Sequence, residues 1–298
     1  MKIGIIGSNG YIGRNMSHYL SLVNENEIYN FDIHQRSNFE SNNYCSLDIT
    51  NKKDLLNIPD DLDFIFLFSG ITGTLDSFQN YEDVFKVNIL GLTNILNHLI
   101  DKNISLVFPS TRLVFKGNEN IDLGETNEKY PLTPYAISKL MGEQLIESYS
   151  NLYNLNYYIF RICVPFGNLI NNDYSYGTLG IFLNQINTDK KITLFGNGKQ
   201  KRTFTHLLDI YDIFEKTLND EVACNEIYNV GGENLTLKQV ANLFAKKYDV
   251  PVDFKSWPES YKKIESGSTS FASLKIDTMI NKKQYNSLSD FIERAHEL

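Results

Sequence analysis

Short apolar runs alternate with helical patterns through the first half of the chain. The runs that predict buried strands cover residues 2–6, 28–31, 64–68, 105–108 and 157–161. Between them, apolar residues recur at helical spacing over residues 11–23, 81–99 and 135–153. Strands that alternate with helices form parallel sheets covered by those helices. The pattern therefore predicts an α/β fold built on a parallel sheet.

The alternation ends after Gly167, where a polar stretch with several glycines follows. Such a stretch suits a smaller region built from excursions of the chain. The patterns over residues 205–214 and 227–230 predict a return to the main sheet. We therefore expect the second region to be discontinuous in sequence.

A glycine-rich turn follows the first predicted strand. It has the sequence Gly7-Ser-Asn-Gly10-Tyr-Ile-Gly13, and the next predicted strand leads into Asp32. Glycines at a strand-to-helix turn let backbone N–H groups approach a pyrophosphate, and the helix dipole favours the anion. The spacing differs by one residue from the Gly-x-Gly-x-x-Gly fingerprint, and such a motif alone also occurs by chance in loops. Asp32 strengthens the prediction, because an acid at this place binds the adenosine ribose.

Asp32 also discriminates between the two nicotinamide cofactors. A carboxylate hydrogen-bonds the free 2′-hydroxyl of NAD and repels the 2′-phosphate of NADP. Asp32 also fits a solvated acid at a strand end, and Arg36 nearby could accommodate a phosphate. We therefore expect NAD, with NADP as the alternative.

The composition restricts the partners of the protein. The chain of 298 residues carries a formal net charge of −8, which disfavours nucleic acid and anionic membranes, since both need a basic face. Cys45, Cys163 and Cys224 are scattered and form no metal-binding motif, so we expect no metal site. Met1 leads directly into a strand without a signal peptide, and no stretch suits a membrane span, so we expect a cytoplasmic protein.

Tyr135 and Lys139 lie four residues apart on a predicted helix and therefore project from one face. A free tyrosine with a pKa near 10 is a poor base at neutral pH, and about 4 kcal/mol of differential stabilisation would bring its pKa close to 7. A neighbouring ammonium and a positive nicotinamide ring supply such stabilisation in a water-poor cleft. In isolation, the same spacing also fits a surface pair without a role.

Thr111 comes just after the strand predicted over residues 105–108. Ligands bind at the carboxyl ends of strands in open α/β sheets, so its hydroxyl could hydrogen-bond a substrate oxygen during hydride transfer. A turn threonine is the alternative. Thr111, Tyr135 and Lys139 are thus the catalytic candidates.

These residues resemble those of the extended short-chain dehydrogenase/reductases, and specifically the nucleotide-sugar epimerase/dehydratase group. The resemblance covers nearly the whole chain and depends on the order and spacing of the motifs. They are the glycine turn, Asp32, Asp48-Ile49, Phe68-Ser69-Gly70, Asn88 to Asn94, Thr111, Tyr135-x-x-x-Lys139, Arg161, Gly196 to Asp209 and Tyr228 to Gly232.

The resemblance implies a Rossmann-type doubly wound parallel sheet with a smaller, discontinuous C-terminal substrate-binding domain. The NAD-binding domain would cover residues 1–166 and be rejoined by about 205–231, and residues 167–298 would mainly bind the nucleotide sugar. The residues implied to bind the cofactor are Gly7, Asn9, Gly10, Tyr11, Ile12, Gly13, Asp32, Asp48, Ile49, Phe68, Ser69, Gly70, Asn88, Tyr135 and Lys139.

Among these residues, Asp48 and Ile49 would flank the adenine, Asn88 would support Tyr135, and Lys139 would also bond the nicotinamide ribose. For the substrate, the resemblance implies that Arg202 grips the diphosphate of a nucleotide sugar, because a guanidinium fork fits phosphate oxygens. A solvated charge is the alternative for Arg202. Lys263 is the nearest candidate for a second phosphate contact, and we expect His206 to be structural.

Three reactions of this group compete. A 4,6-dehydratase carries Asp-Glu directly after the threonine, whereas this chain has Arg112 and Leu113. A 4-epimerase needs only the threonine, tyrosine and lysine, with retained NAD. A 4-ketoreductase uses the same residues with a dissociable, usually phosphorylated cofactor, and residues 110–117 also resemble dTDP-4-keto-rhamnose reductases. Asp32 favours NAD and epimerisation.

Some members of this superfamily bind a dinucleotide without turnover, but they typically lose the tyrosine, which this chain retains as Tyr135. The resemblance further implies a homodimer, formed as a four-helix bundle by the helix over residues 81–99 and the helix of Tyr135. The usual setting of this group is the supply of sugars for cell-surface polysaccharide.

Overall fold

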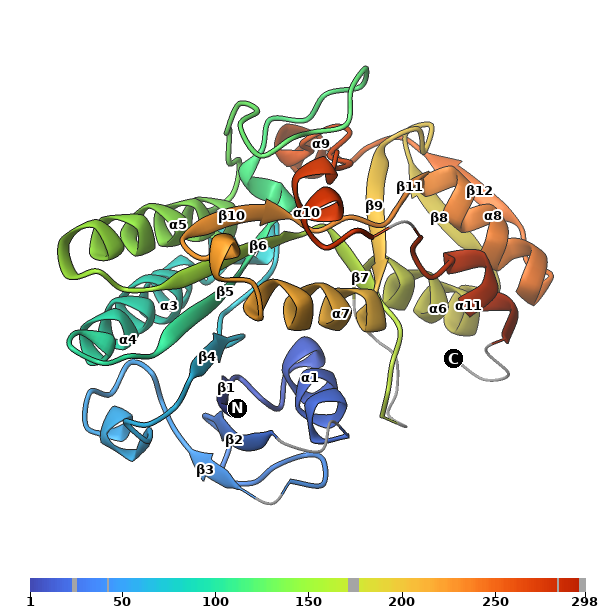
Figure 1. The fold of residues 1–298 in the computed structure, drawn as a ribbon. Coiled ribbons are helices and arrows are strands. Elements are labelled where there is room, and N and C mark those ends of the chain that lie inside the picture. The colour runs from blue at the N-terminus through green and yellow to red at the C-terminus, as the bar shows by residue number, and fades with distance from the viewer. Residues whose placement is uncertain (23–25, 42, 171–176, 283, 295–298) are drawn as a thin grey trace. The chain divides into compact units, whose positions relative to one another are not determined.

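The computed structural model describes residues 1–22, 26–41, 43–170, 177–282 and 284–294 (Figure 1). By their packing, the residues form two compact units, each assembled from three stretches of the chain. The assignment of one domain to the cofactor and another to the substrate stays a prediction. Unit 1 comprises Met1–Val114, Pro131–Arg161 and Leu218–Ile227, and unit 2 comprises Phe115–Tyr130, Ile162–Thr217 and Tyr228–Leu298.

Most of unit 1 is built on a seven-stranded sheet with the order β10-β6-β5-β4-β1-β2-β3. Strand β1 pairs in parallel with β2 and β4, while β3 and β5 continue the parallel pairing outward. The strand order reverses between β1 and β4, as in Rossmann-type doubly wound sheets, which confirms the predicted fold class. The strands are β1 (Lys2–Ile6), β2 (Glu27–Asp32), β3 (Tyr44–Ser46), β4 (Phe64–Leu67), β5 (Ser105–Thr111), β6 (Tyr157–Ile162) and β10 (Glu226–Asn229).

Burial on both faces explains why these strands appear as continuous apolar runs. Ile5, Ile65, Val107 and Ile159 lie on four different strands and are fully buried. A parallel sheet with helices on its faces offers no side to solvent, so the strands do not alternate apolar and polar residues. This is the pattern from which the strands were predicted.

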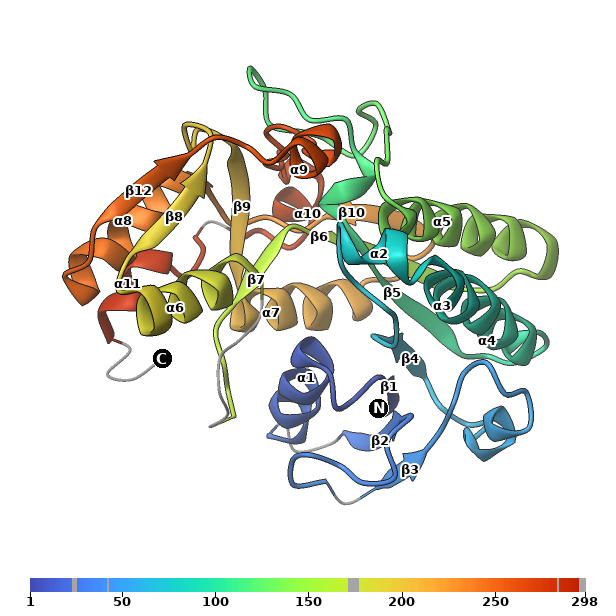
Figure 2. The ribbon, with the colours of Figure 1, turned by 180° about the vertical axis from the view of Figure 1, so that it is seen from behind.

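The helices of unit 1 follow the predicted order. Helix α1 packs against β1 and β2, and α3, α4 and α5 lie side by side (Figures 1 and 2). Helix α1 ends at Ser21, and Val23, where its predicted end lay, is outside the described residues. The helices are α1 (Tyr11–Ser21), α2 (Asp76–Gln79), α3 (Tyr81–Phe85), α4 (Leu92–Leu99) and α5 (Pro134–Tyr153), with short 3-10 turns at Asp54–Asn57, Arg112–Val114 and Glu221–Ala223.

The helix predicted over residues 81–99 contains a π-helical turn, Lys86–Gly91, between α3 and α4. Asn88 lies in this turn, and its side-chain amide pairs with both backbone groups of Ile71. Such turns within helices are frequent at functional sites. The π turn therefore indicates that a functional site lies in this part of unit 1.

Unit 2 contains two small sheets. Strand β9 (Lys201–His206) pairs antiparallel with β11 (Glu233–Thr236) and parallel with β7 (Val164–Phe166), and β8 (Ile192–Phe195) pairs in parallel with β12 (Val252–Lys255). A capping box at Thr236 and Gln239 begins the helix after β11. The helices of unit 2 are α6 (Gly177–Asp189), α7 (Leu207–Leu218), α8 (Leu237–Tyr248), α9 (Glu259–Ile264), α10 (Leu274–Met279) and α11 (Leu288–Arg294).

One sequence expectation about the sheets is confirmed and one is wrong. Of residues 227–230, the first three return to the main sheet as part of β10. Residues 205–214 do not, because β9 joins the three-stranded sheet and residues from Leu207 onward form α7. The apolar residues that suggested a strand, Ile210, Tyr211, Ile213 and Phe214, instead bury one side of that helix.

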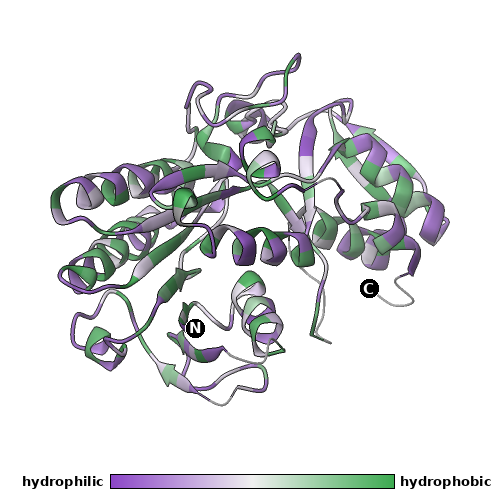
Figure 3. Ribbon diagram, in the orientation of Figure 1, coloured by the Kyte–Doolittle hydropathy of each residue, from purple (hydrophilic) through white to green (hydrophobic). Residues whose placement is uncertain are grey.

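In the part of the chain that the structure describes, no helix is both long and apolar enough to span a membrane. Among the same residues, no cluster of three or more histidine, cysteine or acidic side chains is placed to hold a metal ion. Cys45, Cys163 and Cys224 carry free thiols. Figure 3 shows hydrophilic and hydrophobic residues alternating around α4 and α5, the pattern of helices with one packed face.

Candidate functional site

The glycine turn after β1 is packed too tightly for side chains. Gly7 has φ 88°, and a Cβ on it would lie 2.4 Å from the backbone nitrogen of Ser69. A Cβ on Gly13 would lie 2.3 Å from the carbonyl oxygen of Gly7. Gly10 precedes α1 as its N-cap and offers no side-chain cap to the first turn. The turn therefore brings bare backbone and a helix N-terminus to the carboxyl end of β1.

This turn forms one wall of a cavity of about 370 Å³ in unit 1. The cavity lies at the carboxyl ends of β1 and β4, between which the strand order reverses, and doubly wound sheets bind their ligands at this place. Nine of the predicted cofactor residues line it, and six further residues were missed. The nine are Gly7, Asn9, Gly10, Asp32, Asp48, Ile49, Phe68, Ser69 and Gly70, and the six are Ile33, His34, Asn38, Leu47, Ile71 and Val87.

Asp32 is held in a fixed orientation at the end of β2. Its Oδ2 accepts a hydrogen bond from the backbone N–H of Asn9 at 3.0 Å, and its Oδ1 lies 2.6 Å from Nδ1 of His34. The residue is buried, yet it lines the cavity. A carboxylate oxygen accepts more than one hydrogen bond, so Asp32 retains capacity for ribose hydroxyls.

The side chain of Asn9 organises the loop after β2. Its Nδ2 donates to the carbonyl oxygen of Arg36 at 3.0 Å and to the hydroxyl of Tyr44 at 3.1 Å. Its Oδ1 accepts from the backbone N–H of Asn38 at 3.0 Å. Asn9 thus shapes the wall of the cavity. It also fixes the position of Arg36, the residue that would accommodate the 2′-phosphate if the cofactor were NADP, in the adjoining loop.

The other side of the cavity is formed by residues after β3 and β4. The backbone N–H of Ser69 donates to the carbonyl of Ile6 at 2.8 Å, which ties this loop to the end of β1. Asp48 Oδ1 accepts from both the N–H and the hydroxyl of Thr50 at 2.8 Å. Ile49 is buried, and its carbonyl accepts from Asn94 Nδ2 at 3.0 Å.

Asn88 connects this cavity to helix α5. Besides its pairing with Ile71, its Nδ2 lies 3.0 Å from the hydroxyl of Ser138, the residue before Lys139. A Cβ on Gly70 would lie 3.2 Å from Asn88 Oδ1 and 4.0 Å from Lys139 Nζ. The Lys139 ammonium therefore lies beside a glycine that lines the cavity.

Lys139 is buried, with only 7% of the residue exposed. Its Nζ donates to the carbonyl of Pro109 at 2.8 Å and lies 4.4 Å from the centre of the Phe108 ring. Burial lowers the pKa of Lys139 from 10.5 to about 8, and the opposing charge of Glu143 limits the drop. The bond to Pro109 also holds α5 against β5.

Thr111 and Tyr135 lie at the ends of the two elements that Lys139 joins. Thr111 is the last residue of β5 and is buried, and its Oγ1 accepts from the N–H of Leu113 at 3.3 Å. Tyr135 is in the first turn of α5 and is half-buried. Thr133 caps that turn by accepting from the N–H of Ala136 at 3.1 Å.

Glu143, one helical turn beyond Lys139, was not found from the sequence. Its carboxylate accepts from Arg161 Nη2 at 2.6 Å and from Arg161 Nε at 2.9 Å, and also from the hydroxyl of Ser110. The side chains of Arg161 and Glu143 are only 3% and 2% exposed. The pair anchors α5 to β6. Glu143 also bonds to Ser110, the residue before Thr111 on β5. A signal was present, because Glu143 shares the helix face of Tyr135 and Lys139.

The remaining predicted residues lie elsewhere. Tyr11, Ile12 and Gly13 form the first turn of α1. In unit 2, Arg202 lies on β9, and its buried side chain is ion-paired with Glu265. Lys263 is exposed near the end of α9.

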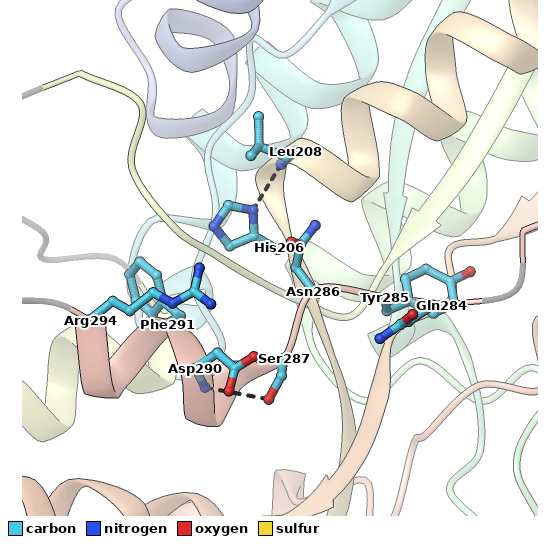
Figure 4. Close-up of a pocket in the computed structure, with 9 residues that line it drawn as sticks. All are labelled: His206, Leu208, Gln284, Tyr285, Asn286, Ser287, Asp290, Phe291 and Arg294. Carbon is cyan, nitrogen blue, oxygen red and sulfur yellow. Dashed lines mark hydrogen bonds between the residues drawn. The ribbon is translucent and has the colours of Figure 1, made fainter.

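His206 has contacts that support the expected structural role. Its Nδ1 accepts from the N–H of Leu208 at 3.1 Å, and burial lowers its pKa (Figure 4). Its ring packs edge-on against Phe166 and Phe291. It borders a second cavity, of about 620 Å³, within unit 2. The other residues that line this cavity are Leu208, Gln284, Tyr285, Asn286, Ser287, Asp290, Phe291 and Arg294.

Known proteins resemble the chain over nearly its full length. Residues 3–231 match the model of the family described as NAD dependent epimerase/dehydratase family. The chain is 26% identical over 264 residues to an uncharacterized UDP-glucose epimerase of Bacillus subtilis (strain 168), covering 82% of this chain and 81% of that protein. It is 24% identical over 297 residues to the CDP-paratose 2-epimerase of Salmonella typhi, covering 87% and 88%.

Among solved structures, the chain is similar to UDP-glucuronic acid 4-epimerase from Bacillus cereus, which was solved in complex with UDP-glucuronic acid and NAD. The TM-score is 0.85 at 22% sequence identity, with 98% of this chain and 97% of that chain covered. At this identity, the likeness establishes the fold.

The buried ammonium of Lys139 predicts a pH dependence of stability. The folded pKa of about 8 lies below the ordinary value of 10.5, so the unfolded state binds more protons between these values, and the free energy of unfolding rises with pH in this window. Relative to Lys139→Met, the wild type should gain about 3 kcal/mol between about pH 7 and about pH 10.5. Urea denaturation of both proteins, without cofactor, measures the gain. Equal pH dependence of the two proteins would mean that Lys139 is not desolvated.

Proposed function

The chain belongs to the NAD dependent epimerase/dehydratase family, and on this premise we propose that it is an NAD-dependent nucleotide-sugar oxidoreductase that acts as a 4-epimerase. The observation that carries the proposal is the position of Lys139. Its ammonium lies beside Gly70 at the cavity of unit 1, on the helix that bears Tyr135. A cation placed there serves both a ribose hydroxyl and the acidity of a neighbouring phenol.

The residues present fit NAD. Gly7 and Gly13 carry no side chain, and a Cβ at either residue would collide with backbone. The bare backbone of the turn allows the close approach that a pyrophosphate needs. The buried, oriented carboxylate of Asp32 suits two free ribose hydroxyls and disfavours a 2′-phosphate. This supports NAD over NADP.

The catalytic residues would then act on the C4 position of the sugar. NAD held by the residues that line the cavity of unit 1 would supply a hydride acceptor, and then a hydride donor, for C4. Tyr135 takes the proton of the C4 hydroxyl and later gives it back, and the Lys139 ammonium stabilises the phenolate. Thr111 donates a hydrogen bond to the oxygen at C4. Because the keto sugar turns over between the two steps, the product is the C4 epimer.

The residues after Thr111 argue against loss of water from the sugar. Arg112 and Leu113 occupy the 3-10 turn that follows β5. A guanidinium stays protonated at neutral pH and leucine has no titratable group, so neither serves as an acid-base pair. This supports epimerisation over dehydration.

A 4-ketoreductase is the second candidate. It is favoured by Ser110 and by the Val114-Phe115 pair, which fit the reductase-like segment over residues 110–117. Arg36 also lies in the loop beside Asp32, where it could meet a 2′-phosphate. A reductase would release its cofactor and require a 4-keto substrate.

The cofactor separates these two candidates. We expect denatured protein to release NAD, and native protein to convert a nucleotide sugar with a free C4 hydroxyl into its epimer without added cofactor. Mass spectrometry identifies the released cofactor, and NMR of the incubated sugars identifies the product. Strict dependence on added NADPH and a 4-keto sugar would instead establish the reductase.

Replacing Tyr135 by Phe tests the catalytic assignment. The variant should lose at least about 100-fold in kcat, because general acid-base catalysis contributes at least this much, while NAD stays bound. Tyr149→Phe is the control, since Tyr149 lies on the same helix and its hydroxyl bonds to Asn97. Unchanged function in Tyr135→Phe would support a dinucleotide sensor without turnover.

We further propose that the enzyme is a homodimer formed through the helices of unit 1. Several large apolar side chains are exposed on α2, α3, the π turn and α5, which contact one another. A cluster of exposed apolar residues on adjoining helices marks an association surface. Two such faces related by two-fold symmetry would form a four-helix bundle. The residues are Phe78, Tyr81, Leu90, Ile137 and Met141.

A charge on this face should separate the subunits. Met141→Lys would bury an unpaired ammonium in the proposed interface, so the variant should elute as a monomer. Size-exclusion chromatography with light scattering measures the mass. Leu56→Lys, at an exposed leucine on the 3-10 turn Asp54–Asn57, is the control and should keep the wild-type mass. A monomeric wild type would refute the proposed dimer.

A further inference from the structure

Arg202 is the residue of unit 2 expected to grip a diphosphate, and its guanidinium is already engaged. Its side chain is 4% exposed, and Nη2 donates to Glu265 Oε1 at 2.7 Å. Nη1 donates to the carbonyl oxygens of Lys201 at 2.8 Å and Gly267 at 2.5 Å. An incoming anion therefore meets an arginine that already has a carboxylate partner.

The two sides of this guanidinium bind different kinds of group. Nη1 bonds only to backbone carbonyls, which ties β9 to the segment around Gly267. The other edge consists of Nη2 and Nε, and a carboxylate or phosphate can bind this edge through two parallel hydrogen bonds. Glu265 takes only Nη2, and Nε donates to no group among the described residues. This anion-binding edge of Arg202 is thus half occupied.

The Glu265 side chain is placed so that it can move away from Arg202. Its side chain is 24% exposed, far more than that of Arg202, and its Oε1 has one further partner, the N–H of Gly267 at 3.1 Å. Beyond Gly267 the segment has another anchor, because Glu119 accepts from the backbone N–H of Ser268 at 2.9 Å and from the Ser268 hydroxyl at 2.7 Å. The segment can therefore stay in place while the Glu265 side chain turns toward solvent.

We propose that Glu265 is an internal anion that occupies the anion-binding edge of Arg202, and that a nucleoside diphosphate binds there by displacing it. The proposal builds on the proposed function, since it concerns the diphosphate of the same substrate. A phosphate group engages Nη2 and Nε together, whereas Glu265 engages Nη2 alone. The exchange also keeps the buried guanidinium paired with an anion throughout.

Displacement makes Glu265 a determinant of substrate affinity. Its carboxylate competes with the phosphate oxygens for one edge, and it opposes their negative charge. A ligand with a single weak anionic group gains little from the exchange, whereas a diphosphate gains a second hydrogen bond and a larger charge. Glu265 therefore favours diphosphate-bearing ligands over monoanions.

The test compares Glu265→Gln with the wild type, using UDP and inorganic pyrophosphate as probes in isothermal titration calorimetry. Gln keeps the shape and an acceptor oxygen but removes the competing charge, so both probes should bind with a Kd at least about tenfold lower than in the wild type. Arg202→Gln in the Glu265→Gln background should abolish this gain.

Glu119→Gln is the matched control. It removes the same charge from a carboxylate that contacts the same segment but has no bond to Arg202, so its Kd for both probes should stay close to the wild-type value. An equal gain in Glu119→Gln would show a general charge effect, and no gain in Glu265→Gln would show that Glu265 does not compete. Either result would overturn the proposal.

Two further outcomes remain informative. If Glu265→Gln does not fold, Glu265→Asp replaces it, because the shorter carboxylate loses its reach to Nη2 but keeps the charge. It should bind both probes more tightly than the wild type, and unchanged binding overturns the proposal. If Glu265→Gln gains affinity for pyrophosphate while no nucleotide sugar is turned over, the proposed function fails and the displacement stands.

Discussion

The close approach of backbone at the carboxyl ends of β1 and β4 is the constraint on which the rest of unit 1 depends. Gly7, Ser69 and Gly13 leave no room between them for a Cβ, so the first turn of α1 begins directly over the strand ends. The cavity, the orientation of Asp32 and the position of the loop after β4 all follow from this contact. A single methyl group here would separate elements that the whole site needs together.

The catalytic side is organised by charges buried against one helix. Lys139 and Glu143 are one turn apart on α5, and each reaches a different partner on the neighbouring strands, Pro109 and Arg161. An unpaired charge in this environment would be costly, whereas paired groups with satisfied hydrogen bonds persist. The helix is thereby positioned by electrostatics as well as by apolar packing.

Much of unit 1 could be predicted, because its strands are buried on both faces and its helices have one packed face. The short strands β3 and β7 have three residues each, which is too few for a pattern to emerge. Most residues of the cavity follow closely on predicted strand ends, as Asp32 and Ser69 do, and so could be placed.

The partners of single charged residues were harder to predict. Glu265 lies 63 residues from Arg202 along the chain, and nothing in the local sequence of either residue indicates the other. Helix α7 was missed for a related reason, since a short apolar run fits either a strand or one side of a helix. In the structure β9 ends at His206, and the apolar run that follows forms α7.

The π turn has a consequence for how this chain tolerates changes in length. A π turn contains one more residue than an α-helical turn. The extra residue is taken up within the turn, so the residues after it keep the orientation that a regular helix one residue shorter would give them. Asn88 then faces inward to Ile71 and Ser138, while Leu90 is 47% exposed. Deleting one residue between Lys86 and Gly91 would convert the bulge into regular helix and leave the packed side of α4 in register, whereas the same deletion within α4 would rotate its apolar stripe away from the core. In homologous sequences, single-residue gaps should therefore gather at this bulge.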